Sequence, residues 1–101
     1  MKIDLCIPTY NARQKLQRCV ESVFKYTDAD AFNRIFIIND ASPDDTADYL
    51  ENLKKERPDI ECVNLETNHF KCRPLNIALE NTEAEFLVCL DDDTEVTEGW
   101  L

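Results

Sequence analysis

Short apolar runs alternate with segments of helical periodicity along this chain. The apolar runs cover residues 2–7, 34–39, 60–65 and 86–90. Each run is short and continuous, which is typical of a strand buried on both faces. Pro8 is expected to end the first strand, because proline donates no backbone hydrogen bond to a sheet.

Helices are expected between these runs, over about 11–26, 42–58 and 74–81. Asn11 and Ser42 are expected to cap the first two helices, and Pro43 suits the first helical position of the second. Apolar residues recur at intervals of three and four, which places them on one face of each helix. They are Leu16, Cys19, Val20, Val23 and Phe24, then Ala47, Leu50 and Leu53, then Leu75, Ala78 and Leu79. The order of strands and helices predicts an α/β domain with a parallel sheet and right-handed crossovers.

Composition and charge narrow the classes of function. An apolar fraction of 44% supports a packed core, and 101 residues suffice for one domain, residues 1–101. A net charge of -10 argues against nucleic-acid binding, which needs Lys and Arg. A divalent cation can nevertheless carry a nucleotide diphosphate into an acidic pocket. Apolar runs are too short to span a bilayer, and the first residues do not look like a signal peptide, so a cytoplasmic location is expected.

The five cysteines are expected to be free thiols in a reducing compartment. None of their spacings is that of a zinc or thioredoxin-like motif. Cys6, Cys62 and Cys89 fall within the expected buried strands, where a thiol behaves as a small apolar side chain.

Polar residues follow every expected strand, at residues 8–11, 39–42, 68–71 and 91–93. In parallel α/β sheets, ligands bind beyond the carboxyl ends of the strands. A ligand site is therefore expected along this edge of the sheet. Glycine-rich phosphate loops are excluded as its basis, because the chain has one glycine, Gly99.

Asp91, Asp92 and Asp93 are the strongest candidate within that edge. Adjacent carboxylates at a strand end repel one another unless a cation compensates them. Oxygen ligands at this density suit Mg²⁺ or Mn²⁺, and a solvated acidic turn is the structural alternative. A calcium loop is disfavoured, because Val96 stands where such a loop needs glycine.

Other polar residues at the strand ends have a functional and a structural interpretation each. Asp40 could accept a hydrogen bond from a uracil N–H or a ribose hydroxyl, or could be an ordinary turn residue. Tyr10 could stack on a nucleobase, or lie half-buried in the core. Lys71 and Arg73 could meet diphosphate oxygens, or form a solvated helix start. His69 is interpreted as a loop residue.

Together, the four strand ends resemble those of the family 2 glycosyltransferases of the GT-A fold. The matching pieces are Ile7-Pro8-Thr9-Tyr10-Asn11, residues 38–46, Asn68 with Asn76, and Leu90-Asp91-Asp92-Asp93, which is similar to the family's D-x-D motif. The resemblance covers nearly the whole chain. It implies the Rossmann-like nucleotide-binding half of that fold, with about four parallel strands in the order 3-2-1-4 and helices on both faces.

The resemblance also implies a site for a nucleotide sugar, with a UDP-sugar favoured over other nucleotides. Asp40 would bind the base, and Asp93 would ligate a Mn²⁺ or Mg²⁺ ion that bridges the phosphates. The full set of substrate-binding residues would be Pro8, Thr9, Tyr10, Asp40, Arg73, Asp91 and Asp92, with Asp93 and Asp91 as metal ligands. Departures from the family pattern at Asn39, Ala41 and Phe70 bear on the identity of the donor more than on the fold.

Beyond the donor, the resemblance implies an acceptor hydroxyl on a saccharide, a lipid-linked molecule or a protein. Family members continue past the metal motif, so we expect this chain to be truncated there and to lack the catalytic base. Glu95 and Glu98 lie too close to the motif to be assigned that role. Exposed apolar surface with self-association, and peripheral membrane association of a full-length enzyme, are further expectations. The alternative function is a nucleotide- or metal-binding, or purely structural, module of the same fold.

Overall fold

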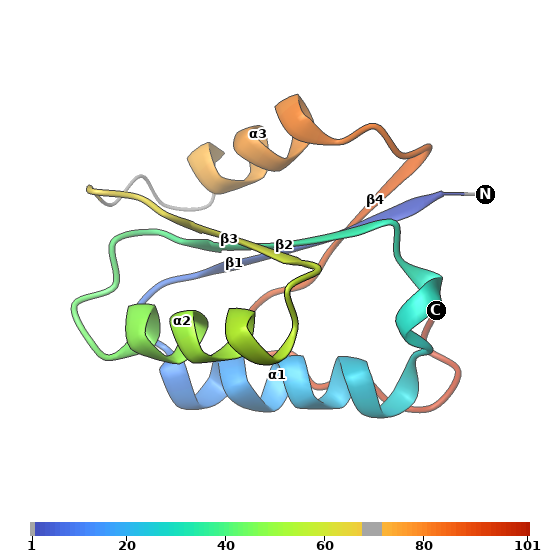
Figure 1. Cartoon of the computed structure of the whole chain (residues 1–101), viewed down its shortest axis with the longest axis horizontal. Helices are drawn as coiled ribbons and strands as arrows, with labels where there is room; N and C mark the ends of the chain where they lie inside the picture. The colour runs from blue at the N-terminus through green and yellow to red at the C-terminus, as the bar shows by residue number, and fades with distance from the viewer. Residues whose placement is uncertain (1, 68–71) are drawn as a thin grey trace.

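The expected order of strands and helices is confirmed by the computed structural model, which describes residues 2–67 and 72–101 (Figure 1). For Ala29, Cys72 and Arg73, it describes the backbone alone. The elements are β1 (Ile3–Thr9), α1 (Arg13–Tyr26), the 3-10 turn η1 (Ala29–Ala31), β2 (Arg34–Asn39), α2 (Thr46–Glu56), β3 (Ile60–Asn64), α3 (Cys72–Asn81) and β4 (Phe86–Cys89).

The strands form one parallel sheet in the order β3-β2-β1-β4. Helices α1 and α2 cover one face, and α3 covers the other (Figure 1). The expected fold class, strand order and helix placement are therefore confirmed. Because all strands run the same way, their carboxyl ends share one edge of the sheet. In the described part of the chain, we find no helix with the length and apolarity needed to cross a membrane.

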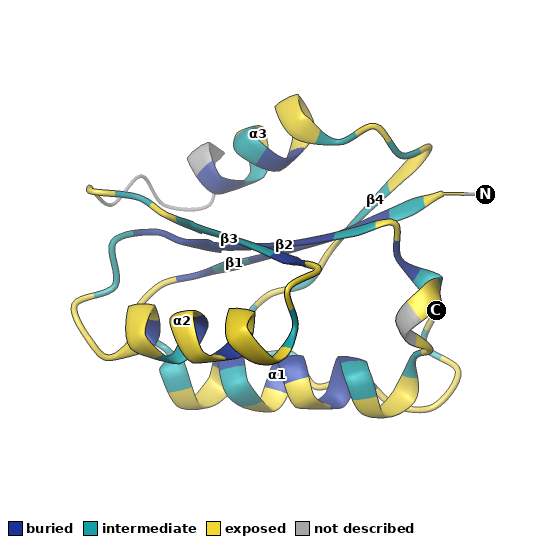
Figure 2. Ribbon diagram, in the orientation of Figure 1, coloured by how far each residue is buried: buried dark blue, intermediate teal, exposed yellow. Residues whose placement is uncertain are grey.

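The apolar core lies on both faces of the sheet, as the continuous apolar strands predict (Figure 2). Leu5 and Ile7 of β1 pack toward α1, whereas Cys6 packs toward α3 with Phe36 and Ala78. Successive side chains of a strand point to opposite faces, so both faces of β1 and β2 are buried. These two central strands provide a rigid base for the loops that follow them.

The expected end of the first strand at Pro8 is wrong, because β1 runs on to Thr9. The carbonyl of Cys6 accepts a hydrogen bond from Leu90 N, so the backbone at Cys6 faces β4. Pro8 lies two residues on and faces the same side. Since β4 ends at Cys89, opposite Cys6, no described strand requires a hydrogen bond from Pro8. Proline is therefore tolerated inside this strand.

Helices α1 and α2 begin later than the sequence pattern predicts. The first begins at Arg13, and Asn11 has a positive φ of 49° instead of serving as its cap. The second begins at Thr46, because Ser42 and Asp44 use their side chains otherwise. The hydroxyl of Ser42 accepts from Asn11 N at 2.9 Å, and the carboxylate of Asp44 accepts from Thr46 N at 3.1 Å. These side-chain hydrogen bonds thus replace the expected first turn of α2.

The buried faces of α2 and α3 also differ from the pattern at single positions. Ala47 is exposed, whereas Thr46, one turn before Leu50, is buried. Leu79 is 55% exposed, whereas Ala78 is buried against the sheet. A three- and four-residue spacing allows two adjacent faces of a helix, and packing against the sheet selects one of them.

The edge strands are less buried than expected. Phe86 of β4 is 54% exposed, Cys89 is exposed, and Cys62 of β3 is half-buried. Strands β3 and β4 each have one neighbour in the described sheet, so fewer side chains cover them. The expected burial of Cys6 is confirmed, and that of Cys62 and Cys89 is wrong. Cys6, Cys19, Cys62 and Cys89 are all free thiols.

Candidate functional site

The ends of β1, β2 and β4 meet at one edge of the sheet. Asp40 N donates a hydrogen bond of 2.9 Å to the carbonyl of Thr9, which joins the ends of β2 and β1. Leu90 N donates one of 3.0 Å to the carbonyl of Cys6, which joins β4 to the other side of β1. The acidic triplet therefore lies on the same rim as Tyr10 and Asp40.

Asp92 makes the direct link between the acidic triplet and β1. Its Oδ2 accepts hydrogen bonds from Thr9 Oγ1 at 2.9 Å and from Tyr10 N at 3.3 Å. Thr9 is 3% exposed, so its hydroxyl is used inside the protein to orient Asp92. Tyr10 is 47% exposed, which contradicts the alternative of a core tyrosine and leaves its ring open to a ligand.

Asp91 and Asp93 lie on the exposed side of the turn that follows β4. Thr94 N donates to the carbonyl of Asp91 at 3.1 Å and closes this turn. The triplet thus relieves its charge repulsion by turning Asp92 inward to two donors and Asp91 and Asp93 toward solvent. Among residues 2–67 and 72–101, no three His, Cys, Asp or Glu side chains form a preformed metal cluster.

The negative charge of this turn acts on Cys19 of α1. The thiol of Cys19 on α1 donates to the carbonyl of Asp91 at 3.7 Å. Burial, together with the negative charges of Asp92, Asp93 and Asp91, raises the pKa of Cys19 to about 12. An anionic ligand therefore meets a negative potential at this rim.

The segment after the turn is anchored on α1. Val96 N donates to Ser22 Oγ at 3.0 Å, and the Val96 side chain is buried. Trp100 Nε1 donates to Thr27 Oγ1 at 2.6 Å. These contacts fix the path of the chain after the acidic triplet. Sequence spacing does not reveal them, because each joins residues more than seventy positions apart.

The loop after β2 is shaped by Asn39 and Asp40, both almost fully buried. Asn39 Oδ1 accepts from Ser42 N at 3.1 Å, and Asn39 Nδ2 donates to Asn64 Oδ1 at 2.9 Å. The amide of Asn39 thus acts as acceptor and donor at once, which gives this departure from the family pattern a structural role. The next residue, Ala41, has a positive φ of 62°, a conformation for which glycine is better suited.

A set of polar contacts, the loop clamp, holds the β1–α1 and β2–α2 loops together. It consists of Asn11, Arg13, Ser42, Asp44 and Asp45. Arg13 N donates to Asp44 Oδ2 at 3.2 Å, and Arg13 Nε pairs with Asp45 Oδ1 at 3.2 Å. Burial raises the pKa of Asp44, but the hydrogen bonds from Thr46 and Arg13 outweigh it and lower the pKa overall. The clamp therefore joins the loop that contains Tyr10 to the loop that contains Asp40.

The structure describes few of the other residues that the sequence singles out. The side chain of Arg73, and Asn68, His69, Phe70 and Lys71 entirely, fall outside the described residues. Glu95 and Glu98 are exposed and follow the acidic turn.

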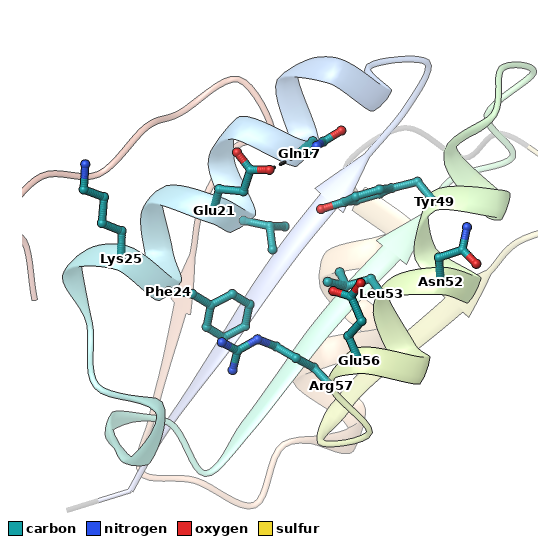
Figure 3. Close-up of a pocket in the computed structure, with 10 residues that line it drawn as sticks. Gln17, Glu21, Phe24, Lys25, Tyr49, Asn52, Leu53, Glu56 and Arg57 are labelled. Carbon is teal, nitrogen blue, oxygen red and sulfur yellow. Dashed lines mark hydrogen bonds between the residues drawn. The ribbon is translucent and has the colours of Figure 1, made fainter.

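A separate groove of about 610 Å³ lies between α1 and α2 (Figure 3). The guanidinium of Arg57 lies over the Phe24 ring, 3.6 Å from its centroid. Among the residues whose side chains the structure describes, no site residue expected from the sequence lines this groove.

Comparison with known proteins shows which family this chain resembles. The chain matches the family model described as glycosyl transferase family 2 over residues 4–101. It is 33% identical over 94 residues to the poly-β-1,6-N-acetyl-D-glucosamine synthase of Staphylococcus epidermidis, which covers 93% of this chain and 22% of that protein. The chain therefore spans about a fifth of the length of this curated relative.

Solved structures show the same arrangement of elements. The crystal structure of S. aureus TarS 1-349 matches with a TM-score of 0.78 and 28% identity, over 92% of this chain and 28% of that one. TarS 1-349 has also been solved in complex with UDP-GlcNAc. The mannosyltransferase PcManGT from Pyrobaculum calidifontis, solved with GDP-Man and Mn²⁺, matches with a TM-score of 0.80 over 91% of this chain and 27% of that one. At 22% identity, this last likeness shows the fold alone.

Proposed function

This chain belongs to glycosyl transferase family 2, and on that premise we propose that it carries the donor site of an enzyme that transfers a sugar from a nucleoside diphosphate to an acceptor hydroxyl. The main support is the contact of Asp92 with Thr9 and Tyr10. This contact holds an acidic turn against the end of β1, beside the buried Asp40. The rim so formed combines an exposed aromatic ring, a buried carboxylate and two exposed carboxylates.

We propose a UDP-sugar as the donor, with UDP-N-acetylglucosamine as the first to test. The related synthase is named for an N-acetylglucosamine polymer, and TarS was crystallised with UDP-GlcNAc. In this chain, the exposed ring of Tyr10 would stack on the base, and Asp40 would accept its imide N–H. Pro8 would lie beside them at the end of β1, and Arg73 near the diphosphate.

Asp93 and Asp91 would hold a Mn²⁺ or Mg²⁺ ion together with the diphosphate. Both residues are exposed on one turn, and Mg²⁺ is usually held by one or two carboxylates plus substrate phosphates and water. A preformed cluster of three protein ligands is not required for such a site, so the residues present fit it. When bound, the ion would neutralise charge on the leaving diphosphate.

The residues of the chain itself would bind and orient the donor. Thr9 would fix the rotamer of Asp92, whose second carboxylate oxygen would then face a ribose or sugar hydroxyl. The loop clamp would keep Tyr10 and Asp40 at the spacing of a nucleobase. Since β1 and β2 are buried on both faces, these groups stand on a support that moves little when the ligand binds.

Thermal unfolding tests this function directly. UDP with Mn²⁺ is expected to raise Tm in proportion to the logarithm of ligand concentration, whereas UDP or Mn²⁺ alone should raise it much less. Asp93→Asn should remove the shift, and Glu98→Gln, an exposed carboxylate on the same segment, should keep it. A Tm that no nucleoside diphosphate raises, with or without metal, would support the structural module instead.

A further inference from the structure

Cys6 and Cys89 stand directly opposite each other on neighbouring parallel strands. Cys6 lies on β1 and Cys89 on β4, and the two are Cα partners in the sheet register. Neighbouring strands lie about 4.8 Å apart, and disulfides join Cα atoms about 4.4–6.8 Å apart. Partners in a parallel register point to the same face of the sheet, here the face that α3 covers. The register of the two strands therefore suits a disulfide between these two residues.

The two thiols differ in access to solvent. Cys6 is fully buried in the centre of the sheet, whereas Cys89 is exposed on the edge strand. Burial, together with the neighbouring Cys89, raises the pKa of Cys6 to about 12. A reagent in solution therefore reaches Cys89 first, and Cys6 is the second thiol to react.

Cys19 and Cys62, the other cysteines whose side chains the structure describes, have no cysteine as a Cα partner in the sheet. The thiol of Cys19 donates to the carbonyl of Asp91, and that of Cys62 to the carbonyl of Leu50. In the described part of the chain, the register thus singles out one pair of thiols. Cys6 lies three residues before Thr9, and Cys89 lies two residues before Asp91. A disulfide between them would therefore link β1 to β4 close to the proposed donor site.

We propose that Cys6 and Cys89 form a dithiol modification site, which a small-molecule disulfide such as oxidised glutathione converts into a cross-strand disulfide. In the first step, the Cys89 thiolate attacks one sulfur of the reagent, forms a mixed disulfide and releases one thiol. In the second step, the Cys6 sulfur attacks the Cys89 sulfur and the Cys6 proton passes to the departing glutathione thiolate, which leaves as the second thiol. Two protein thiols are oxidised to one disulfide, and one reagent disulfide is reduced to two thiols.

Peptide mapping of the full chain tests the proposal. The folded protein is incubated with oxidised glutathione, quenched in acid, alkylated in denaturant and digested. We expect a peptide pair linked through Cys6 and Cys89, a loss of two hydrogen atoms from the intact mass, and reversal by dithiothreitol. Cys62→Ser and Cys72→Ser should form the same link, and Cys89→Ser should not.

The Cys6→Ala variant provides a second, independent readout. Without the resolving thiol, glutathione should remain on Cys89, whereas in the unchanged chain this adduct should be transient. Near-native circular dichroism of Cys6→Ala makes the comparison valid, and Cys6→Ser serves as the alternative if alanine unfolds the chain. A stable glutathione adduct on Cys89 in the unchanged chain, or a link from Cys89 to any other cysteine, would overturn the proposal.

Discussion

Replacing Thr9 with valine removes the hydroxyl that orients Asp92 and changes little else. Valine has the same shape and favours strands, and Thr9 is 3% exposed, so the backbone should stay in place. The lost bond is 2.9 Å long and joins a hydroxyl to a carboxylate. Hydrogen bonds to charged groups contribute about 1.5–3 kcal/mol. Because Asp92 is half-buried and keeps Tyr10 N as a donor, we expect a loss near the lower end, about 1–2 kcal/mol.

Two assays separate the structural and functional parts of this loss. In a domain of this size, Thr9→Val should lower Tm by roughly 5–10 °C. Asp92 would then sample other rotamers, and a penalty of about 1 kcal/mol corresponds to roughly fivefold weaker binding of UDP with Mn²⁺ in calorimetric titration. Thr9→Ser keeps the hydroxyl and should restore the affinity even if it is less stable. Unchanged stability together with unchanged affinity in Thr9→Val would refute the role given to this contact.

Three further outcomes follow from the described contacts. Tyr10→Ala should weaken nucleotide binding by about tenfold, since base stacking contributes about 1–3 kcal/mol, with little change in Tm, and Tyr10→Phe should bind normally in the same titration. Asp4 is fully buried near the start of β1, away from the candidate site, and accepts hydrogen bonds from Asn33 Nδ2 at 3.3 Å and from Thr82 Oγ1 at 2.5 Å. Asp4→Ala should therefore lower the free energy of unfolding in urea by about 2–4 kcal/mol. The nucleotide affinity of the folded protein should not change. The folded-state pKa of Asp44 is lowered, so its contribution to stability is present above its ordinary value of 3.8 and lost as pH falls through the lower folded value. Asp44→Asn should therefore show a shallower loss of stability below about pH 4 in acid titration followed by circular dichroism, and an equally steep loss would contradict this assignment.

The fold could be predicted from the sequence because its determinants are local and repeated. Continuous apolar runs specify strands buried on both faces, and the alternation with amphipathic helices specifies parallel pairing. The errors fall where a distant contact overrides the local pattern. Ser42 is a good helix cap by composition, yet its hydroxyl serves Asn11, thirty-one positions away. Pro8 is tolerated in β1 because β4 has already ended, which no local rule can anticipate.

The candidate site could be predicted in outline, but its internal contacts could not. That Tyr10, Asp40 and the acidic triplet share one rim follows from parallel topology alone. Parallel topology does not show which aspartate of the triplet points inward, because three identical residues in a row differ in nothing that the sequence displays. The contact of Asp92 with Thr9 decides it, and the two residues lie eighty-three positions apart.

The inward turn of Asp92 also bears on how a diphosphate could enter the proposed site. If the three carboxylates shared one ion, removing the ion would leave them in mutual repulsion and the rim would loosen. Here Asp92 is compensated by Thr9 and Tyr10, so the rim is expected to keep its shape without metal. In the proposed site, the exposed carboxylates of Asp91 and Asp93 would repel a nucleotide anion, and salt screens the interaction of exposed charges over about 8 Å at physiological ionic strength. Raising the ionic strength should therefore strengthen the weak binding of UDP alone, by screening repulsion, and weaken the binding of UDP with Mn²⁺, by screening attraction. A parallel response of both affinities to salt in the same titration would show that Asp91 and Asp93 do not face the phosphates.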